Sequence, residues 1–291
     1  MNKLGFMSYI YMGWSAEAMA EDARNHGMVY VQLDPKQSMQ VMDDELFSLV
    51  RAEKIRSIFE RNGISVVGLS GYTNLMNPNL QKGESKLEQL EKMIDLCSAY
   101  GTRYMATETG SLHPTNAWRD YEGNRTAQAW EQLLQIVDRL RNRAAKNGSI
   151  LLVEGFVNNV MASAEQAAGM LKRLGTDGLA FIMDPFNYLT QEDLKRQPEA
   201  MTKIFDCIGE ISPIAHAKDT LYGEGGLTTP RVGAGQADWN VYAELLAQRL
   251  PDVPLILEHA KPEDVAGCLA IIRHAFDNTE ASRGVKNAGG A

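Results

Sequence analysis

The sequence predicts a (β/α)8 barrel, in which eight parallel strands alternate with helices, and three observations lead to this prediction. Eight short apolar runs alternate with longer amphipathic stretches over 291 residues, a repeat of about 36 residues that fits one strand–helix unit. The chain also suits the length of about 250 residues that such a barrel requires. The competing fold is an open, doubly wound sheet, which usually carries a nucleotide-binding motif. The sequence has no GxGxxG after the first apolar run, and it contains no GxxxxGK[ST].

The expected strands are runs of four or five residues bounded by Gly, Pro, Asn or Asp. This pattern is typical of strands that are buried on both faces of a parallel sheet. In chain order they are Leu4–Met7, Tyr30–Leu33, Ser65–Leu69, Arg103–Thr107, Ile150–Glu154, Ala180–Asp184, Ile214–Ala217 and Leu255–Glu258.

Helical periodicity fills much of the sequence between these runs. Glycine follows several of the helical stretches, where a left-handed cap residue is favoured, and Asp238 precedes another as an N-cap. The expected helices are Ala16–Asn25, Asp44–Arg61, Lys86–Tyr100, Ala127–Lys146, Glu165–Leu174, Trp239–Arg249 and Pro262–Phe276. No linker interrupts the pattern, so we expect residues 1–277 to form one domain. Residues 278–291 are rich in Gly, Ala and Asn without an apolar stripe, which predicts a mobile tail.

Composition argues against several classes of partner. There are 29 Lys and Arg against 37 Asp and Glu, a net charge of −8, which disfavours binding to nucleic acid. The three cysteines have no paired spacing, so neither a disulfide framework nor a CxxC metal site is expected.

No apolar run approaches the roughly 18 residues of a membrane span. The apolar N-terminus resembles a weak signal peptide, but Gly5, Ser8 and Gly13 interrupt it, and we expect a soluble cytoplasmic protein.

Four successive expected strands end in an acid or an imidazole. These residues are Glu154, Asp184, His216 and Glu258. In a barrel the carboxyl ends of the strands share one rim, where the chemistry is located. Isolated carboxylates in apolar strands are costly to bury unless they are paired or bound to a cation. The set therefore predicts a divalent-ion site made of nitrogen and oxygen ligands.

These residues and their surroundings resemble those of the xylose isomerase-like barrel superfamily, in particular its sugar phosphate isomerase/epimerase branch, which includes endonuclease IV. The HAKD and VGAGQADW pair is fairly specific for this branch, whereas the individual acids are not. The match spans roughly residues 1 to 276. It comprises Glu154 in LLVEG, Asp184 in MDPFN, HAKD at His216–Asp219, VGAGQADW at Val232–Trp239 and Glu258 in LILEH, with softer matches in LGFMSY, SGYTN and ATETGS.

The resemblance implies roles for the four strand-end residues. Glu154, Asp184, His216 and Glu258 would bind one divalent ion, Mn²⁺ first, with Mg²⁺, Co²⁺ or Zn²⁺ as alternatives. Glu154 and Glu258 would also be the catalytic acid and base. An ion that chelates a ketose carbonyl and its neighbouring hydroxyl makes the intervening C–H more acidic and stabilises the ene-diolate. Two carboxylates on opposite faces of that carbon then remove and return the proton.

The sequence departs from the ketose 3-epimerases of this family at two positions. Val160 stands where they have a second substrate-contacting glutamate, and Asn187 stands where they have a histidine. Both changes weaken the transfer of a particular epimerase activity. The chain's five histidines are also too few for the clustered zinc ions of endonuclease IV.

Five further residues are candidates for substrate binding, namely Glu108, His113, Asn187, Lys218 and Arg231. Lys218 could instead neutralise the surplus carboxylates, and His113 and Arg231 could be ordinary surface residues. Core packing is favoured over pocket lining for Tyr72, Asn74 and Trp118, and a structural role for Asp219 and Trp239. His26, His259 and His274 are expected to be structural.

The predicted function is isomerisation or epimerisation of a small sugar, keto-sugar or related polyol. Two alternatives stay open. One is a lyase resembling inosose dehydratase, which starts with the same proton abstraction and then expels water. The other is a non-catalytic sugar-binding accessory protein. The lack of a Ser/Gly/Lys run typical of phosphate sites favours an unphosphorylated substrate, and the formation of a homo-oligomer is left open.

Overall fold

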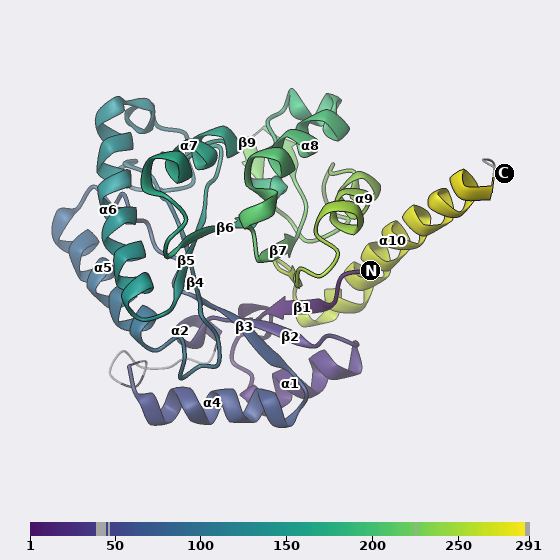
Figure 1. Cartoon of the computed structure of the whole chain (residues 1–291), viewed down its shortest axis with the longest axis horizontal. Coiled ribbons are helices and arrows are strands. Elements are labelled where there is room, and N and C mark those ends of the chain that lie inside the picture. Colours follow the sequence, from purple (N-terminus) through teal and green to yellow (C-terminus); the bar gives the residue numbers. More distant parts are fainter. Residues whose placement is uncertain (39–44, 46, 225, 289–291) are drawn as a thin grey trace.

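Eight parallel strands close into a barrel, which confirms the predicted (β/α)8 class (Figure 1). The computed structural model describes residues 1–38, 45, 47–224 and 226–288, without the side chains of residues 280 and 282–288. The barrel is closed because β1 pairs with both β2 and β10. Its strands are β1 (Leu4–Met7), β2 (Tyr30–Leu33), β3 (Ser65–Ser70), β4 (Tyr104–Glu108), β5 (Ile150–Glu154), β6 (Leu179–Met183), β7 (Ile214–Ala217) and β10 (Leu255–Leu257).

Helices surround the barrel on the outside (Figure 1). Six of them begin at a Ser, Thr, Asn or Asp whose side chain accepts a hydrogen bond from the first turn, the usual N-cap arrangement. The helices are α1 (Ala16–Asn25), α2 (Pro35–Ser38), α4 (Leu49–Arg61), α5 (Leu80–Asp95), α6 (Ala127–Lys146), α7 (Ala164–Leu174), α8 (Gln197–Ile208), α9 (Trp239–Arg249) and α10 (Val265–Ala288). Short 3-10 turns lie at Ser8–Tyr11, Glu122–Arg125, Pro185–Asn187, Asp193–Lys195, Gly209–Ile211 and Pro262–Asp264.

The expected strands match closely, while some helices differ. Helix α5 begins at Leu80, earlier than expected, because Asn79 caps it by accepting a hydrogen bond from the Lys82 N–H. Helix α4 begins after the Ser48 cap, and the expected start at Asp44 lies outside the described residues. Neither α8 nor the small hairpin formed by β8 (Leu221–Gly223) and β9 (Gly226–Thr228) was predicted from the sequence.

The boundary expected at residue 277 does not coincide with the end of an element. Helix α10 continues to Ala288, and its end projects beyond the barrel (Figure 1). The last described residues are therefore helical, and the mobility of the tail stays a prediction. No helix in the described ranges is long and apolar enough to cross a membrane.

The barrel interior is packed, so the site can form only at its ends. A cluster of buried side chains fills the space inside the strands, and a larger one lies between strands and helices. Such a core leaves the carboxyl ends of the strands as the place for a pocket. The inner cluster consists of Met7, Ala106, Leu152, Ala180, Ile182, Ile214 and Ile256.

Asp219 fixes the loop that follows β7. Its carboxylate accepts hydrogen bonds from the backbone N–H groups of Thr220 (2.8 Å), Gly233 (3.0 Å) and Ala237 (2.9 Å). A Cβ at Gly235 would lie 2.3 Å from the Asp219 Oδ1 atom, so the GAG sequence here permits close backbone packing. The structural role expected for Asp219 agrees with these contacts.

We expect Asp219→Ala to lower the free energy of unfolding by about 2 kcal/mol, because three backbone N–H groups of the loop lose a charged acceptor. Urea denaturation followed by circular dichroism measures this change. The exposed Asp252 supplies the control, since Asp252→Ala removes an equal charge without breaking these bonds. Equal stability of the two variants would contradict the assigned role.

Candidate metal centre and active site

The four strand-end residues meet at the carboxyl end of the barrel. Glu154 is the last residue of β5, Asp184 follows β6, His216 lies in β7 and Glu258 follows β10. All four are buried. Because β5, β6, β7 and β10 are consecutive neighbours in the barrel, their ends form one continuous arc. The barrel therefore brings together the residues that the sequence analysis selected.

The imidazole of His216 is the centre of this arc. Its Nδ1 atom lies 3.0 Å from Glu154 Oε1, 3.3 Å from Glu258 Oε1 and 3.5 Å from Asp184 Oδ2. Burial by itself lowers the pKa of His216, but the charges of Glu154 and Glu258 outweigh it and raise that pKa well above its ordinary value. Without a bound cation, His216 is therefore protonated and offsets one carboxylate charge.

The opposite edge of His216 is held by β2. The Nε2 atom lies 2.9 Å from the Oε1 atom of Gln32, which is itself buried. Gln32 in turn donates to Ser70 Oγ (3.2 Å) and to the Tyr72 hydroxyl (3.3 Å). Since an amide oxygen can only accept, Nε2 carries a proton. If a cation displaced the other proton, the free lone pair would therefore be on Nδ1, the atom that faces the carboxylates.

Several atoms at this centre are buried without a directed hydrogen bond. Among the described residues, no directed hydrogen bond reaches Glu154 Oε1, Glu258 Oε1, His216 Nδ1 or either side-chain oxygen of Asp184, although ion pairs join several of them to one another and to Lys218. Buried polar atoms rarely stay unpaired in proteins. One ligand atom from each of Glu154, Asp184 and His216 lies within 4.8 Å of the others. The unpaired atoms and this spacing fit a divalent cation, with Glu258 beside the triad.

Lys218 balances part of the negative charge. Its Nζ atom lies 2.6 Å from Asp184 Oδ2 and 2.6 Å from Glu258 Oε1. Burial alone would raise the pKa values of both carboxyls, but the ammonium group lowers them, and that of Glu258 lies well below its ordinary range. Burial alone would lower the pKa of Lys218, but the two carboxylates raise it. Lys218 is thus a charged partner of the site.

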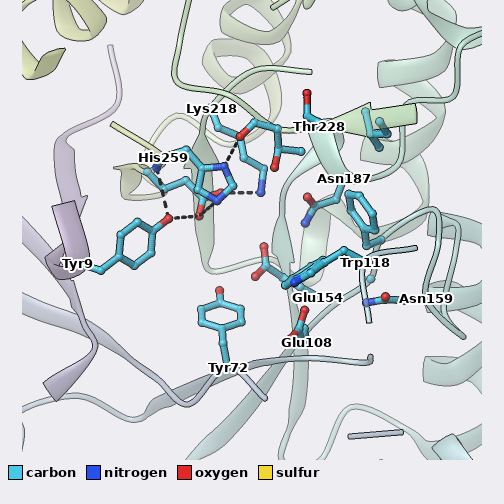
Figure 2. A pocket seen from close by; sticks show the side chains of 15 residues that line it. Tyr9, Tyr72, Glu108, Trp118, Glu154, Asn159, Asn187, Lys218, Thr228 and His259 are labelled. Atoms are coloured by element: carbon cyan, nitrogen blue, oxygen red, sulfur yellow. Dashed lines mark hydrogen bonds and ion pairs between the residues drawn. The ribbon is translucent and has the colours of Figure 1, made fainter. Parts of the chain in front are cut away.

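A tyrosine lies beside each of the two glutamates. The Tyr9 hydroxyl donates to Glu258 Oε2 at 3.0 Å (Figure 2), and Tyr72 lines the same cavity as Glu154. Burial and the nearby carboxylates raise the pKa of both phenols, so both remain neutral. The bond from Tyr9 orients Glu258 and leaves its Oε1 atom toward the centre.

A cavity of about 550 Å³ opens above these groups. Its size is within the range of about 300–1,000 Å³ that is typical of small-molecule sites. Figure 2 shows side chains from opposite sides of the barrel rim converging on it. Its walls are formed by Tyr9, Tyr72, Glu108, Trp118, Glu154, Gly155, Phe156, Asn159, Asn187, Lys218, Leu227, Thr228, Thr229, Glu258 and His259.

Three of the five predicted substrate-binding residues line this cavity, namely Glu108, Asn187 and Lys218. The other two lie outside its walls. His113 Nδ1 accepts hydrogen bonds from the backbone N–H groups of Thr115 and Asn116, so it shapes its own loop. Arg231 pairs with Asp264 at 3.1 Å on the outside of the barrel.

Other side chains in the walls were missed or were assigned to packing. Tyr72 and Trp118 line the cavity, whereas Asn74 braces the next loop by donating to the Ser111 carbonyl. His259, expected to be structural, is also part of the wall. The contact of Gln32 with His216 was not predicted, although a single amide side chain within an apolar strand indicates a buried polar contact.

Burial gives Glu108 unusual chemistry. It ends β4 directly opposite Glu154 in the strand register. Burial raises its pKa to about 8, with Glu154 adding to the effect and Lys218 opposing it. In the absence of a cation, Glu108 is therefore a neutral carboxylic acid at pH 7 and can donate as well as accept.

The chain belongs to the xylose isomerase-like TIM barrel family, whose model matches residues 20–277. This result confirms the superfamily that the sequence motifs suggested. No curated protein matches the sequence.

Three solved structures illustrate the shared fold. A D-tagatose 3-epimerase-like protein superposes with a TM-score of 0.75 at 13% identity, covering 96% of this chain and 99% of that one. A xylose isomerase-like TIM barrel protein from Mycobacterium smegmatis in complex with magnesium gives 0.69 at 15% identity, covering 96% and 97%. A probable 3-DHS dehydratase from Bacillus anthracis gives 0.67 at 14% identity, covering 94% and 99%.

We expect the purified chain to retain about one divalent ion after loading with Mn²⁺ and desalting, because a cation pairs with the unpaired ligand atoms. Inductively coupled plasma mass spectrometry gives the metal content. His216→Ala should lose the ion, while His274→Ala, which alters a solvent-exposed histidine on α10, should keep it. Equal metal contents in the two variants would rule out this site.

We expect Glu108→Gln to stabilise the metal-free protein at alkaline pH. An acid whose pKa is raised on folding holds its proton more tightly in the folded chain, so stability falls as pH rises from its ordinary pKa of 4.5 to about 8. Glutamine cannot ionise, so it removes this loss of stability at alkaline pH, which is about 1.4 kcal/mol for each pKa unit.

Thermal unfolding in EDTA should therefore show a higher melting temperature for Glu108→Gln than for the wild type at pH 9, and little difference at pH 4.5. Glu88→Gln, on the exposed face of α5, is the control and should show no such dependence. A Glu108→Gln effect of the same size at both pH values would contradict the raised pKa.

Proposed function

We propose that the protein is a divalent-metal-dependent isomerase or epimerase of a small, uncharged keto-sugar. The observation that carries this proposal is the meeting of Glu154 and Glu258 around His216 Nδ1, at the base of the cavity. Glu154, Asp184, His216 and Glu258 would hold the cation, Mn²⁺ first. When bound, the cation would withdraw electron density from a carbonyl and its neighbouring hydroxyl and make the C–H between them more acidic.

Glu154 and Glu258 are placed to act as a pair of acid–base groups. They extend from β5 and β10, which are separated in the barrel by β6 and β7, so they approach a bound sugar from different sides. One carboxylate removes the proton from the activated carbon and the other returns a proton to the opposite face, which inverts that centre. The hydrogen bond from Tyr9 holds the Glu258 carboxylate in place for this exchange.

The charge of the cavity supports an uncharged substrate. Lys218 is the one lysine or arginine among the lining residues that the structure describes, and Asp184 and Glu258 already bind its ammonium group. Arg231, once a candidate for clamping an anion, contacts Asp264 instead. A phosphate or carboxylate on the substrate would thus lack a free cationic partner.

A dehydratase is the second candidate, and Glu108 is the observation that favours it. Glu108 lines the cavity, and burial raises the pKa of its carboxyl, so its protonated form can give a proton to a departing hydroxyl group, which leaves as water. The same glutamate pair would first remove the neighbouring C–H proton. The solved structure titled a probable 3-DHS dehydratase shares this fold.

Proton exchange with solvent tests the proposal. We expect the Mn²⁺-loaded protein to incorporate deuterium from D₂O into at least one ketose of a panel of fructose, tagatose, sorbose, psicose, xylulose and ribulose. A parallel reaction in H₂O then separates the two candidates by mass spectrometry, since in H₂O epimerisation conserves the mass and dehydration loses 18 mass units, the mass of one water.

Glu154→Gln and Glu258→Gln should each reduce the exchange by at least about a hundredfold, since general acid–base groups typically contribute factors of that order. Glu88→Gln provides the matched control and should exchange at the wild-type rate. If metal-loaded wild type exchanges no ketose proton and dehydrates no inosose, the remaining alternative is a non-catalytic sugar-binding protein.

A further inference from the structure

The outer part of the cavity has features that the proposed reaction does not require. We infer that this outer part is a second subsite, which binds a further sugar ring attached to the reacting ketose, so that the substrate is a ketose glycoside. We define the subsite by Trp118, Phe156, Leu227 and Thr228, which line the cavity. The inference rests on the proposed function, because it assigns the reacting ketose to the inner end.

Trp118 is unusual because it lines the cavity and yet remains 55% exposed. An aromatic face in the wall of a cavity is available for stacking against a ligand. Its ring meets the edge of the buried Phe156 at a centroid distance of 5.7 Å and an angle of 87°. This single ring contact leaves much of the indole free for a ligand.

The backbone that carries Trp118 is fixed by three asparagines. Asn158 donates to the Trp118 carbonyl at 2.8 Å, and Asn124 donates to the Asn158 carbonyl at 2.7 Å. In the amide orientation that satisfies both of its groups, Asn159 donates to the Ala117 carbonyl and accepts from the Gly110 N–H. Trp118 is therefore held at the mouth before any ligand arrives, which lowers the entropic cost of binding.

The β8–β9 hairpin supplies a further part of the wall through Leu227, Thr228 and the following Thr229. His259 connects the hairpin to the inner end of the cavity, where Glu258 lies, because its Nδ1 atom is hydrogen-bonded to the Thr229 carbonyl (Figure 2). His259 has a φ of 56°, the one positive value at a residue other than glycine in the described ranges. This strained backbone directs the ring toward the hairpin while Glu258 faces the centre.

A pyranose ring suits this slot better than an aliphatic chain. Its C–H face can stack on the indole, while its hydroxyl groups need polar partners at the rim. The amide of Asn187 faces the same space (Figure 2). The cavity of about 550 Å³ also exceeds what one six-carbon sugar fills, which leaves room for a second ring.

Binding of non-phosphorylated ketoses to the Mn²⁺-loaded protein tests the inference independently of turnover. The probes are fructose and four glucosyl-fructoses, turanose, maltulose, leucrose and isomaltulose, which carry the second ring on different hydroxyl groups. We expect at least one of them to bind about tenfold more tightly than fructose by isothermal titration calorimetry. Trp118→Ala should abolish that difference while leaving the fructose affinity within about twofold of the wild type.

Trp14→Ala is the matched control, because Trp14 is 39% exposed but packs on Tyr11 and is absent from the cavity walls. It should keep the preference for the disaccharide. Equal affinity of the wild type for all five sugars would overturn the inference. An equal loss of affinity for fructose and for the disaccharide in Trp118→Ala would also overturn it. A change in oligomeric state on gel filtration with an intact preference would assign Trp118 to a subunit contact instead.

The two proposals fail in different ways. If deuterium exchange is absent but a glucosyl-fructose binds in preference to fructose, the subsite stands and the catalytic proposal fails. If exchange occurs with fructose and no second ring improves binding, the catalytic proposal stands and the subsite fails.

Discussion

The burial of three carboxylates around one imidazole is the constraint on which the site depends. Glu154, Asp184 and Glu258 share a small volume with His216, and their mutual repulsion is costly in a medium of low polarity. Two cations, Lys218 and protonated His216, offset it in the metal-free chain. A divalent ion in the proton's place on His216 would complete the neutralisation, so metal binding and folding would stabilise one another.

The barrel determines which residues can meet, and this explains why the centre was predictable. In a parallel barrel the carboxyl ends of all strands reach one rim, so acids at the ends of β5, β6 and β10 and a histidine in β7 must converge. The strands themselves were predictable for a related reason, since runs buried on both faces leave a strong apolar pattern. The family match over residues 20–277 agrees with this derivation.

The supporting residues were harder to predict, because their positions depend on contacts that the local sequence does not contain. His113 and Arg231 looked like site residues, but their loops turn them toward their own backbone and toward Asp264. Trp118 looked like a core residue, yet its loop is held across the mouth by an asparagine on the 3-10 turn before α6 and by two asparagines after β5. Hydrogen bonds of this kind leave no periodic signal. The hairpin was missed because each of its strands has only three residues.

The division between strands and loops also separates two functions within one cavity. Strand ends hold the carboxylates, the imidazole and Lys218, and their positions follow from barrel closure. The mouth is built by the loop that carries Trp118 and by the hairpin after β7, whose base Asp219 organises. Changes in these loops can alter which substituent fits without moving the acid–base pair, as is general for barrels of this kind. Under the proposed function, the barrel would therefore fix the chemistry of the chain, whereas the choice of sugar would depend on two anchored loops.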